Sequence, residues 1–372
     1  MNMKKQILLS ALLCVLLTAC YHRTDSPRGS WAKGCDLSWL SEMEHDGVQF
    51  YQPSTDSLQS SDCIDLLRAN GMNAVRLRVW VNHSTGWSNK EDMLYLAERA
   101  AKKGQRILLD IHYSDFFADP HHQDIPAGWR TYDYEHLCEA VREYTFDVLY
   151  ALKEKGIKPE WVQIGNETPS GMLWPVGKVS DQMDDARNQQ AWDRYAGFTR
   201  IGYEAAKEAF PDITVIVHVD NAYEYRDWFW QAMRAHGGKW DMIGLSHYPM
   251  MAAWSGKTWQ EMNDLAEHNV QQLIREFHSP VMICEVGMMN YGEGAVYDSV
   301  AAVSEQVMAD FVHRMERIDS CAGIFYWEPE VYGGWRPQEY IPLGWGGYDM
   351  GSFTPDGCPS PALNVLLSSQ HE

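Results

Sequence analysis

The chain contains 372 residues, of which 45% are apolar, and its formal net charge at pH 7 is −20. That apolar content is enough to bury a sizeable core, which excludes an intrinsically disordered protein. The acidic surplus makes nucleic acid and polyanionic substrates poor candidate partners.

The beginning of the chain has the features of a targeting segment. Residues 1–19 combine a short basic start with an apolar stretch too short for a normal membrane span, which predicts a secretory signal peptide. The stretch L-T-A-C also resembles the bacterial lipobox, in which Cys20 becomes the lipidated first residue; an ordinary cleaved signal is the alternative. Residues 20–33 are polar and carry Pro, Gly and Ser, as in a flexible tether. We therefore expect an exported bacterial lipoprotein, anchored to the outer membrane or cell surface only through its N-terminal lipid.

Short β-branched runs alternate with longer amphipathic stretches from residue 34 to residue 368, and no linker or repeat divides them. The expected strands are 34–37, 74–79, 107–112, 161–165, 214–219, 242–246, 281–285 and 323–327. The expected helices are 60–70, 90–103, 134–155, 191–209, 225–236, 258–277 and 300–318. Eight such repeats predict an α/β fold of the (β/α)8 TIM-barrel type, forming a single catalytic domain over 34–368. A doubly wound sheet is the alternative, disfavoured because no strand runs into a G-x-G-x-x-G loop.

Polar and aromatic residues gather at the carboxyl ends of the expected strands, where barrel enzymes carry out their chemistry. They occur in the stretches R-L-R-V-W, D-I-H-Y, G-N-E, S-H-Y, C-E and Y-W-E. Strands buried on both faces should otherwise be apolar throughout. These residues are therefore the candidates for a functional site.

Two glutamates occupy comparable ends of the fourth and seventh expected strands. Strand alternation groups Glu167 with Gln163, and Glu285 with Val281 and Ile283, so both carboxylates are expected to point toward the barrel axis. Paired acids at one barrel mouth suggest glycoside hydrolysis, which requires one protonated acid and one ionised carboxylate. Capping a helix or pairing with a surface cation is the alternative for either residue alone.

Neighbouring residues suggest how the two acids could differ. Arg78 is expected to keep Glu285 ionised, and Tyr248 or His247 could donate a hydrogen bond to Glu285. Asn166 is placed to hold a sugar hydroxyl.

Further substrate contacts are expected at strand ends and in loops. His112 is expected to contact substrate, with a satisfied buried histidine as the alternative, whereas Asp110 lies deeper and suits a structural hydrogen bond. Trp174 and Trp327 are candidate sugar platforms, because flat rings with polar edges suit the faces of sugars; core packing is the alternative.

The cysteines give no sign of a metal centre, since no C-x-x-C pair or metal-like Cys/His spacing is present. Cys35, Cys284 and Cys321 fall in apolar segments and are expected to be buried free thiols. We expect no metal and no cofactor.

Several segments together resemble glycoside hydrolase family 53, the endo-β-1,4-galactanases. They are G-C-D-L-S-W-L-S-E-M-E, V-R-L-R-V-W-V-N, H-Y-S-D-F-F-A-D-P, V-Q-I-G-N-E-T-P-S-G-M-L-W-P and F-Y-W-E-P, in consistent order from Gly34 to about Trp345. The resemblance implies a retaining hydrolase of galactan and galacto-oligosaccharides from pectin side chains, with Glu167 as acid/base and Glu285 as nucleophile. The stretch E-V-G-M-M-N departs from the aromatic residue and Pro that family members often have after the nucleophile. Some bacterial members bind calcium through long loops after the last two strands; here these loops look short and no D-x-D-x-D-G occurs, so the ion is not expected.

Two alternatives remain on sequence grounds. A related barrel glycosidase acting on mannan, xylan or β-glucan would share the site chemistry. A non-catalytic surface glycan-binding lipoprotein would use the barrel mouth and tryptophans alone, but it would have no need for paired acids.

Overall fold

The computed structural model describes residues 31–369, except 54–56, 183–184, 289–296, 338–339 and 341–346. Eight parallel strands form a closed barrel in the order β1-β12-β11-β10-β9-β6-β5-β4. They are β1 (Ala32–Asp36), β4 (Ala74–Val79), β5 (Arg106–Ile111), β6 (Trp161–Ile164), β9 (Thr214–Val219), β10 (Met242–His247), β11 (Val281–Val286) and β12 (Cys321–Tyr326). The predicted (β/α)8 barrel is confirmed, and each expected strand is found within two residues of its predicted ends.

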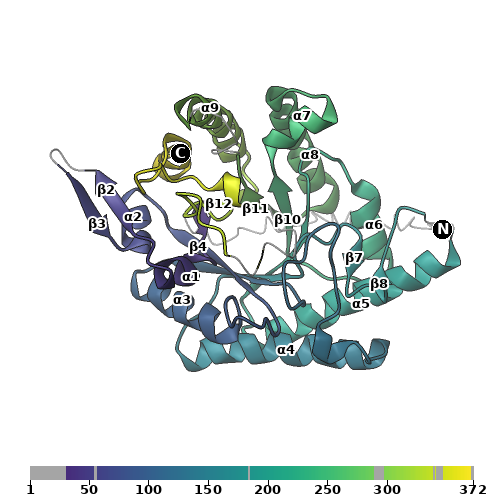
Figure 1. Cartoon of the computed structure of the whole chain (residues 1–372). Coiled ribbons are helices and arrows are strands. Elements are labelled where there is room, and N and C mark those ends of the chain that lie inside the picture. Colours follow the sequence, from purple (N-terminus) through teal and green to yellow (C-terminus); the bar gives the residue numbers. More distant parts are fainter. Residues whose placement is uncertain are drawn as a thin grey trace, which may run out of the picture. The chain divides into compact units, whose positions relative to one another are not determined.

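Helices surround the barrel in the described part of the chain (Figure 1). They are α1 (Leu40–His45), α2 (Cys63–Ala69), α3 (Lys90–Lys102), α4 (Tyr134–Glu154), α5 (Ala186–Ala209), α6 (Asp227–Ala235), α7 (Ala252–Ser255), α8 (Trp259–Phe277), α9 (Tyr297–Glu316) and α10 (Pro361–Ser368). Side-chain caps define several starts: Asp62, Asn89 and Asp133 each accept a hydrogen bond from a backbone N–H in the first turn, and Thr258 forms a capping box with Glu261. None of the helices in the described residues is long and apolar enough to cross a membrane.

The folded domain begins earlier than the sequence indicated. Strand β1 starts at Ala32, and Trp31 is already buried, so residues 31–33, which were expected in the tether, belong to the folded domain. The reason is that Ala32 and Lys33 pair with Gly323 and Ile324 of β12 and close the barrel. The predicted signal peptide, Cys20 and the rest of the tether lie outside the described residues.

Two antiparallel hairpins and a long final connection were not expected. The hairpins are β2 (Phe50–Pro53) with β3 (Leu58–Ser61), and β7 (Gly171–Met172) with β8 (Gly177–Lys178). The expectation of a short loop after the last strand was wrong, because residues 327–360 separate β12 from α10. This segment, which includes the short helix η4 (Gly347–Met350), packs Tyr332 and Phe353 against Phe50 of the β2–β3 hairpin.

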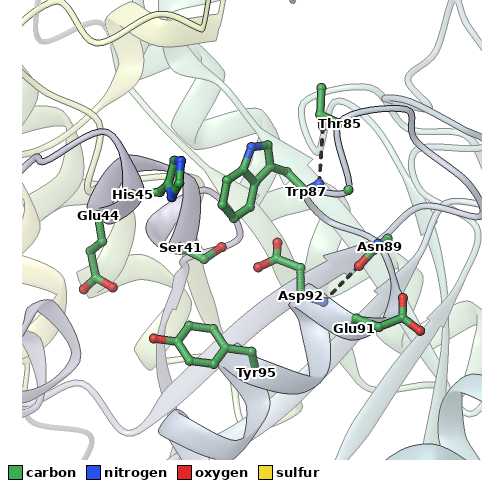
Figure 2. Close-up of a pocket in the computed structure, with 10 residues that line it drawn as sticks. Ser41, Glu44, His45, Thr85, Trp87, Asn89, Glu91, Asp92 and Tyr95 are labelled. Atoms are coloured by element: carbon green, nitrogen blue, oxygen red, sulfur yellow. Dashed lines mark hydrogen bonds between the residues drawn. The ribbon is translucent and has the colours of Figure 1, made fainter.

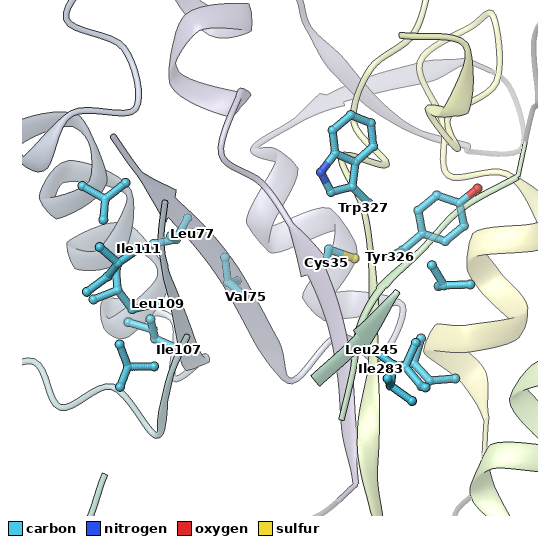
Figure 3. Packing of buried hydrophobic residues seen from close by; sticks show 14 of the residues in the cluster. Cys35, Val75, Leu77, Ile107, Leu109, Ile111, Leu245, Ile283, Tyr326 and Trp327 are labelled. Atoms are coloured by element: carbon cyan, nitrogen blue, oxygen red, sulfur yellow. The ribbon is translucent and has the colours of Figure 1, made fainter. Parts of the chain in front are cut away.

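Alternating strand residues build two separate apolar layers. Val75, Leu77 and their neighbours on β5 face the helices (Figure 3). A smaller cluster fills the base of the barrel interior, with two residues from β11 and one from each of the other seven strands: Ala32, Ala74, Leu108, Trp161, Ile216, Met242, Met282, Cys284 and Phe325. Gly34 leaves room for the Phe325 ring, since a Cβ at residue 34 would lie 2.2 Å from it. Above this base the inward positions become polar, which creates the site.

The cysteines behave as expected where they are described. Cys35, Cys284 and Cys321 are buried free thiols. Burial raises the pKa of each of these thiols, so all three stay protonated near neutral pH.

Candidate active site

A β-bulge brings Glu285 into the barrel interior. Met282 and Cys284 face inward at the base, whereas Ile283 belongs to the outer layer, so simple alternation would point Glu285 toward the helices. The register between β10 and β11 shifts between Leu245 and Ser246, so that Ile283 pairs with Leu245 but Glu285 pairs with Ser246. An extra residue in one strand reverses the facing of everything after it. The expected inward direction of Glu285 is correct, but its grouping with Val281 and Ile283 is wrong.

Arg76, and not Arg78, is the cationic partner of Glu285. The Arg76 Nη2 donates to Glu285 Oε1, Asp110 Oδ2 and Asn166 Oδ1, each at 2.8 Å. Its Nη1 pairs with Asp36, and its Nε donates to Gln163 Oε1 at 2.8 Å. Arg76 and Arg78 share the inward face of β4, but Arg76 lies one pleat deeper, level with Asp36 of β1. The prediction of Arg78 as this partner was therefore correct about the face of β4 and wrong about the position along the strand.

Tyr248 supplies the second contact to the same carboxylate. Its hydroxyl donates to Glu285 Oε2 at 2.6 Å, as expected. His247 does not take this role, because its Nε2 lies 2.9 Å from Asn263 Oδ1 and its ring stacks on Phe311. Burial raises the pKa of Glu285, while the charge of Arg76 and the Tyr248 hydrogen bond act to lower it. Both partners favour the ionised form.

Glu167 reaches the site through a turn at the end of β6. Gly165 and Glu167 have φ angles of +86° and +42°, in the left-handed region that favours glycine. Gln123 holds this turn, because its Nε2 donates to the carbonyl oxygens of Asn166 at 2.8 Å and Glu167 at 3.0 Å. Burial raises the pKa of Glu167 well above its usual range, and the charge of Glu285 raises it further. Glu167 is therefore the acid that stays protonated, and Glu285 is the one with groups that favour its charge.

His218 connects the Glu167 turn to Ser246, the residue beside Glu285. Its Nδ1 lies 2.9 Å from Gln163 Nε2, 3.0 Å from Asn166 Oδ1 and 3.4 Å from the backbone nitrogen of Glu167. Its other ring nitrogen, Nε2, lies 2.9 Å from Ser246 Oγ. Burial and the charge of Arg76 lower the pKa of His218 well below its usual range, so the ring is neutral. Ser246 Oγ in turn lies 3.5 Å from Glu285 Oε2.

Asn166 and His112 are placed at the site but are largely engaged by the protein. Asn166 Nδ2 donates to the Ala118 carbonyl at 2.8 Å. The His112 Nε2 lies 2.8 Å from Asp110 Oδ2, and its Nδ1 accepts from the Ala118 N–H at 2.9 Å. Both His112 nitrogens are thus bonded within the protein, which matches the satisfied-histidine alternative. Asp110 has the structural role expected for it, and the substrate contacts of Asn166 and His112 stay predictions.

The two candidate platforms differ in their surroundings. Trp327 is buried to 5% exposure, with its ring centroid 5.6 Å from that of Trp39 in an edge-on arrangement. Trp174 is half-buried, and the Lys178 ammonium lies 4.1 Å from its ring centroid. Their roles as sugar platforms stay predictions.

A second buried cluster surrounds Arg78 near the same end of the barrel. Its guanidinium pairs with Glu328 and lies 4.5–5.0 Å from the ring centroids of Trp39, Trp80 and Phe117. Its Nε donates to Ser88 Oγ at 3.1 Å.

Sequence reasoning missed the roles of Arg76, His218, Ser246 and Gln123. Strand alternation could have found the first three, because each is polar at an inward position of a buried strand. Gln123 lies in a loop, and no sequence pattern marked it. No group of His, Cys, Asp or Glu in the described residues is arranged to hold a metal ion.

A closed (β/α)8 barrel with two buried glutamates at the C-terminal ends of β6 and β11 defines a barrel glycoside hydrolase. The sequence model of glycosyl hydrolase family 53 matches residues 32–366 of this chain. This match covers most of the chain, and the chain belongs to that family.

Individual relatives agree with this assignment. An uncharacterized protein in the bgaB 5' region of Niallia circulans is 32% identical and covers 91% of this chain and 95% of its own length. Arabinogalactan endo-β-1,4-galactanase A of Aspergillus niger is 30% identical, covering 80% of this chain and 84% of the fungal one. A solved structure from a study of two fungal β-1,4-galactanases has a TM-score of 0.75 at 27% identity, covering 91% of this chain and 99% of the other.

Proposed function

We propose that this protein is a retaining endo-β-1,4-galactanase acting on galactan and type I arabinogalactan. The observation that carries the proposal is the contrast between two neighbouring acids: Glu285 is held by Arg76 and Tyr248, whereas the pKa of Glu167 is raised well above its usual range. The substrate is argued from family 53 and from the galactanases among the relatives.

In the first step, protonated Glu167 gives its proton to the glycosidic oxygen as the bond to the anomeric carbon breaks. Glu285 attacks that carbon from the opposite face and forms a glycosyl ester. Its charge moves into the new bond, and Arg76 and Tyr248 stabilise the carboxylate before and after that transfer.

In the second step, ionised Glu167 takes a proton from water, which attacks the anomeric carbon and releases Glu285. The β configuration is restored. We expect the two carboxyl groups to lie about 5 Å apart, the separation of retaining enzymes, and not near the roughly 9 Å that leaves room for a water between them.

The test is to incubate the protein with linear galactan, arabinogalactan, mannan, xylan and β-glucan and to measure the size of the products. Internal cleavage of galactan with early release of mixed oligosaccharides supports the proposal, and proton NMR should show the β-anomer first. Preferred cleavage of mannan, xylan or β-glucan would assign the enzyme to another polysaccharide. Binding of galactan with no cleavage would favour a glycan-binding protein.

We also infer that the mature protein carries lipid on Cys20 and is anchored to the outer membrane or cell surface. The support is the L-T-A-C motif and the polar stretch that follows it. Mass spectrometry of the mature amino terminus tests this inference: a diacylglyceryl-modified Cys20 is expected, and an unmodified terminus after Ala19 would contradict it.

A further inference from the structure

A pocket of about 570 Å³ lies outside the acid pair, and none of the residues assigned to the active site lines it. Its walls come from α1, from the connection between β4 and α3, and from the start of α3 (Figure 2). Because that connection follows the carboxyl end of β4, the pocket lies at the same end of the barrel as Glu167 and Glu285.

Aromatic rings form part of the pocket wall. Trp87 is half-buried, and the His45 ring packs against it with a centroid separation of 5.3 Å. Tyr95 is 53% exposed, and the Arg99 guanidinium lies 5.4 Å from its ring centroid. Each ring is thus supported by a neighbour, and Figure 2 shows Trp87 and Tyr95 on opposite sides of Ser41 and Asp92.

Polar groups between these rings are held in place and incompletely used. Asp92 accepts a hydrogen bond from the Ser88 N–H at 2.8 Å, and Glu44 pairs with Arg99 at 2.6 and 2.9 Å. Ser41 is 7% exposed, and its hydroxyl interacts with the Asp92 carboxyl, so the two groups line the pocket together. A carboxylate offers about four acceptor sites, so Asp92 can still accept a hydrogen bond from a ligand hydroxyl.

The combination selects the chemistry of the ligand. Carboxylates at the wall disfavour an anion, and Glu44 already pairs with Arg99, which weakens the case for a cation. A neutral ligand with many hydroxyl groups and one apolar face fits both features, because carboxylates accept from hydroxyls and an aromatic ring covers C–H groups. A hexose unit has this character.

We propose that this pocket is a second carbohydrate-binding site that holds a galactose unit of a β-1,4-galactan chain outside the catalytic cleft. The choice of galactan rests on the proposed function. Holding the polymer at a second point on the same rim raises its effective concentration near the acids without contributing to the chemistry.

The experiment compares full-length wild type with Trp87→Ala, Tyr95→Ala and Tyr150→Ala on two substrates. Tyr150 is the matched control, since it is 44% exposed on α4 and lines neither this pocket nor the active site. The substrates are long galactan and an aryl β-galactobioside, which is too short to leave the cleft. We expect Trp87→Ala to raise KM on galactan by about threefold to tenfold, as for loss of one aromatic contact, with kcat unchanged. Tyr95→Ala should act in the same direction, and Tyr150→Ala should match wild type.

Three results would overturn the second site: unchanged KM on galactan in both pocket variants, equal losses on galactan and the short substrate, or an equal effect of Tyr150→Ala. A separate measurement keeps this inference distinct from the proposed function. Galactan retardation in affinity gels is compared between Glu285→Ala and Glu285→Ala/Trp87→Ala. Weaker retardation of the double variant supports galactan binding at the pocket, even where the wild type cleaves no galactan. Identical retardation contradicts binding there.

Discussion

Two buried arginines, Arg76 and Arg78 on β4, lie at the centres of two clusters that differ in how charge is compensated. All three nitrogens of the Arg76 guanidinium group have acceptors, among them the carboxylates of Asp36, Asp110 and Glu285. Arg78 has an Nη2 without a partner in the described residues. Beside its partner Glu328 lies Glu330, which is fully buried and interacts with the Glu328 carboxyl group.

The difference shows how one fold treats charge in two ways. Around Arg76 the hydrogen bonds fix a charged state, which a nucleophile requires. Around Arg78 burial raises the pKa of Glu328 to about 7, and burial with the Glu328 charge raises the pKa of Glu330 well above its usual range. The cluster around Arg78 therefore keeps a proton on Glu330, whereas the cluster around Arg76 favours ionised carboxylates.

The largest expected effect comes from the acids themselves. Glu285→Ala should abolish turnover on every substrate, because the covalent route is lost. Glu167→Ala should lower the rate on galactan by roughly 10² to 10⁴, the usual contribution of proton transfer. With a dinitrophenyl galactoside the Glu167 variant should still form the glycosyl-enzyme, and azide should release it as β-galactosyl azide. Azide rescue of Glu285→Ala with an α-configured product, and none for Glu167→Ala, would reverse the roles.

Replacing each arginine tests whether loss of the cation destabilises the fold more in the Arg76 cluster than in the Arg78 cluster. Arg76→Met leaves several buried carboxylates without a cation and should cost about 3–5 kcal/mol in the free energy of unfolding. Arg78→Met should cost no more than about half of that, because Glu328 can take up a proton instead. Urea unfolding at pH 7 measures both. Equal losses, or a larger loss for Arg78→Met, would contradict the contrast.

Tyr248→Phe sharpens the account of how Glu285 stays ionised. Loss of a hydrogen bond to a charged group should lower kcat/KM by about tenfold to a hundredfold. The pKa of Glu285 should rise, so the acidic limb of the pH profile of kcat/KM should move to higher pH. Tyr203→Phe is the control, since its hydroxyl donates to Asp241 at 2.9 Å, away from the site. A lower rate with an unmoved acidic limb would show that Tyr248 acts on substrate alone.

The smallest expected effect concerns pH and the second cluster. The folded-state pKa of Glu330 lies above its unfolded value, so its contribution to stability is complete below about pH 4.5 and is lost as pH rises. Glu330→Gln removes that loss. Between pH 6 and 7 the wild type should lose up to about 1.4 kcal/mol of stability more than the variant, for the one proton involved. Denaturant unfolding at several pH values measures the slopes, and parallel slopes would show that Glu330 holds no extra proton.

The sequence by itself determined the architecture and the two candidate catalytic acids. Periodicity located all eight strands, because a strand buried on both faces is an apolar run that stops where the barrel ends. The same rule identified Glu167 and Glu285 as candidates, since a carboxylate that follows such an apolar run must lie at the rim of the barrel. The stretches resembling family 53 belong to these same strand ends.

Tertiary structure alone decided the depth and the pairing of the charged groups. Alternation gives Arg76 and Arg78 the same face, and only the register of β4 against β1 puts Arg76 level with Asp36. The bulge that turns Glu285 inward arises from the pairing of β10 and β11, which a single strand does not encode. The early start of β1 at Ala32 depends in the same way on closure against β12. In each case the cause is the pairing of one strand with another, which neither strand encodes by itself.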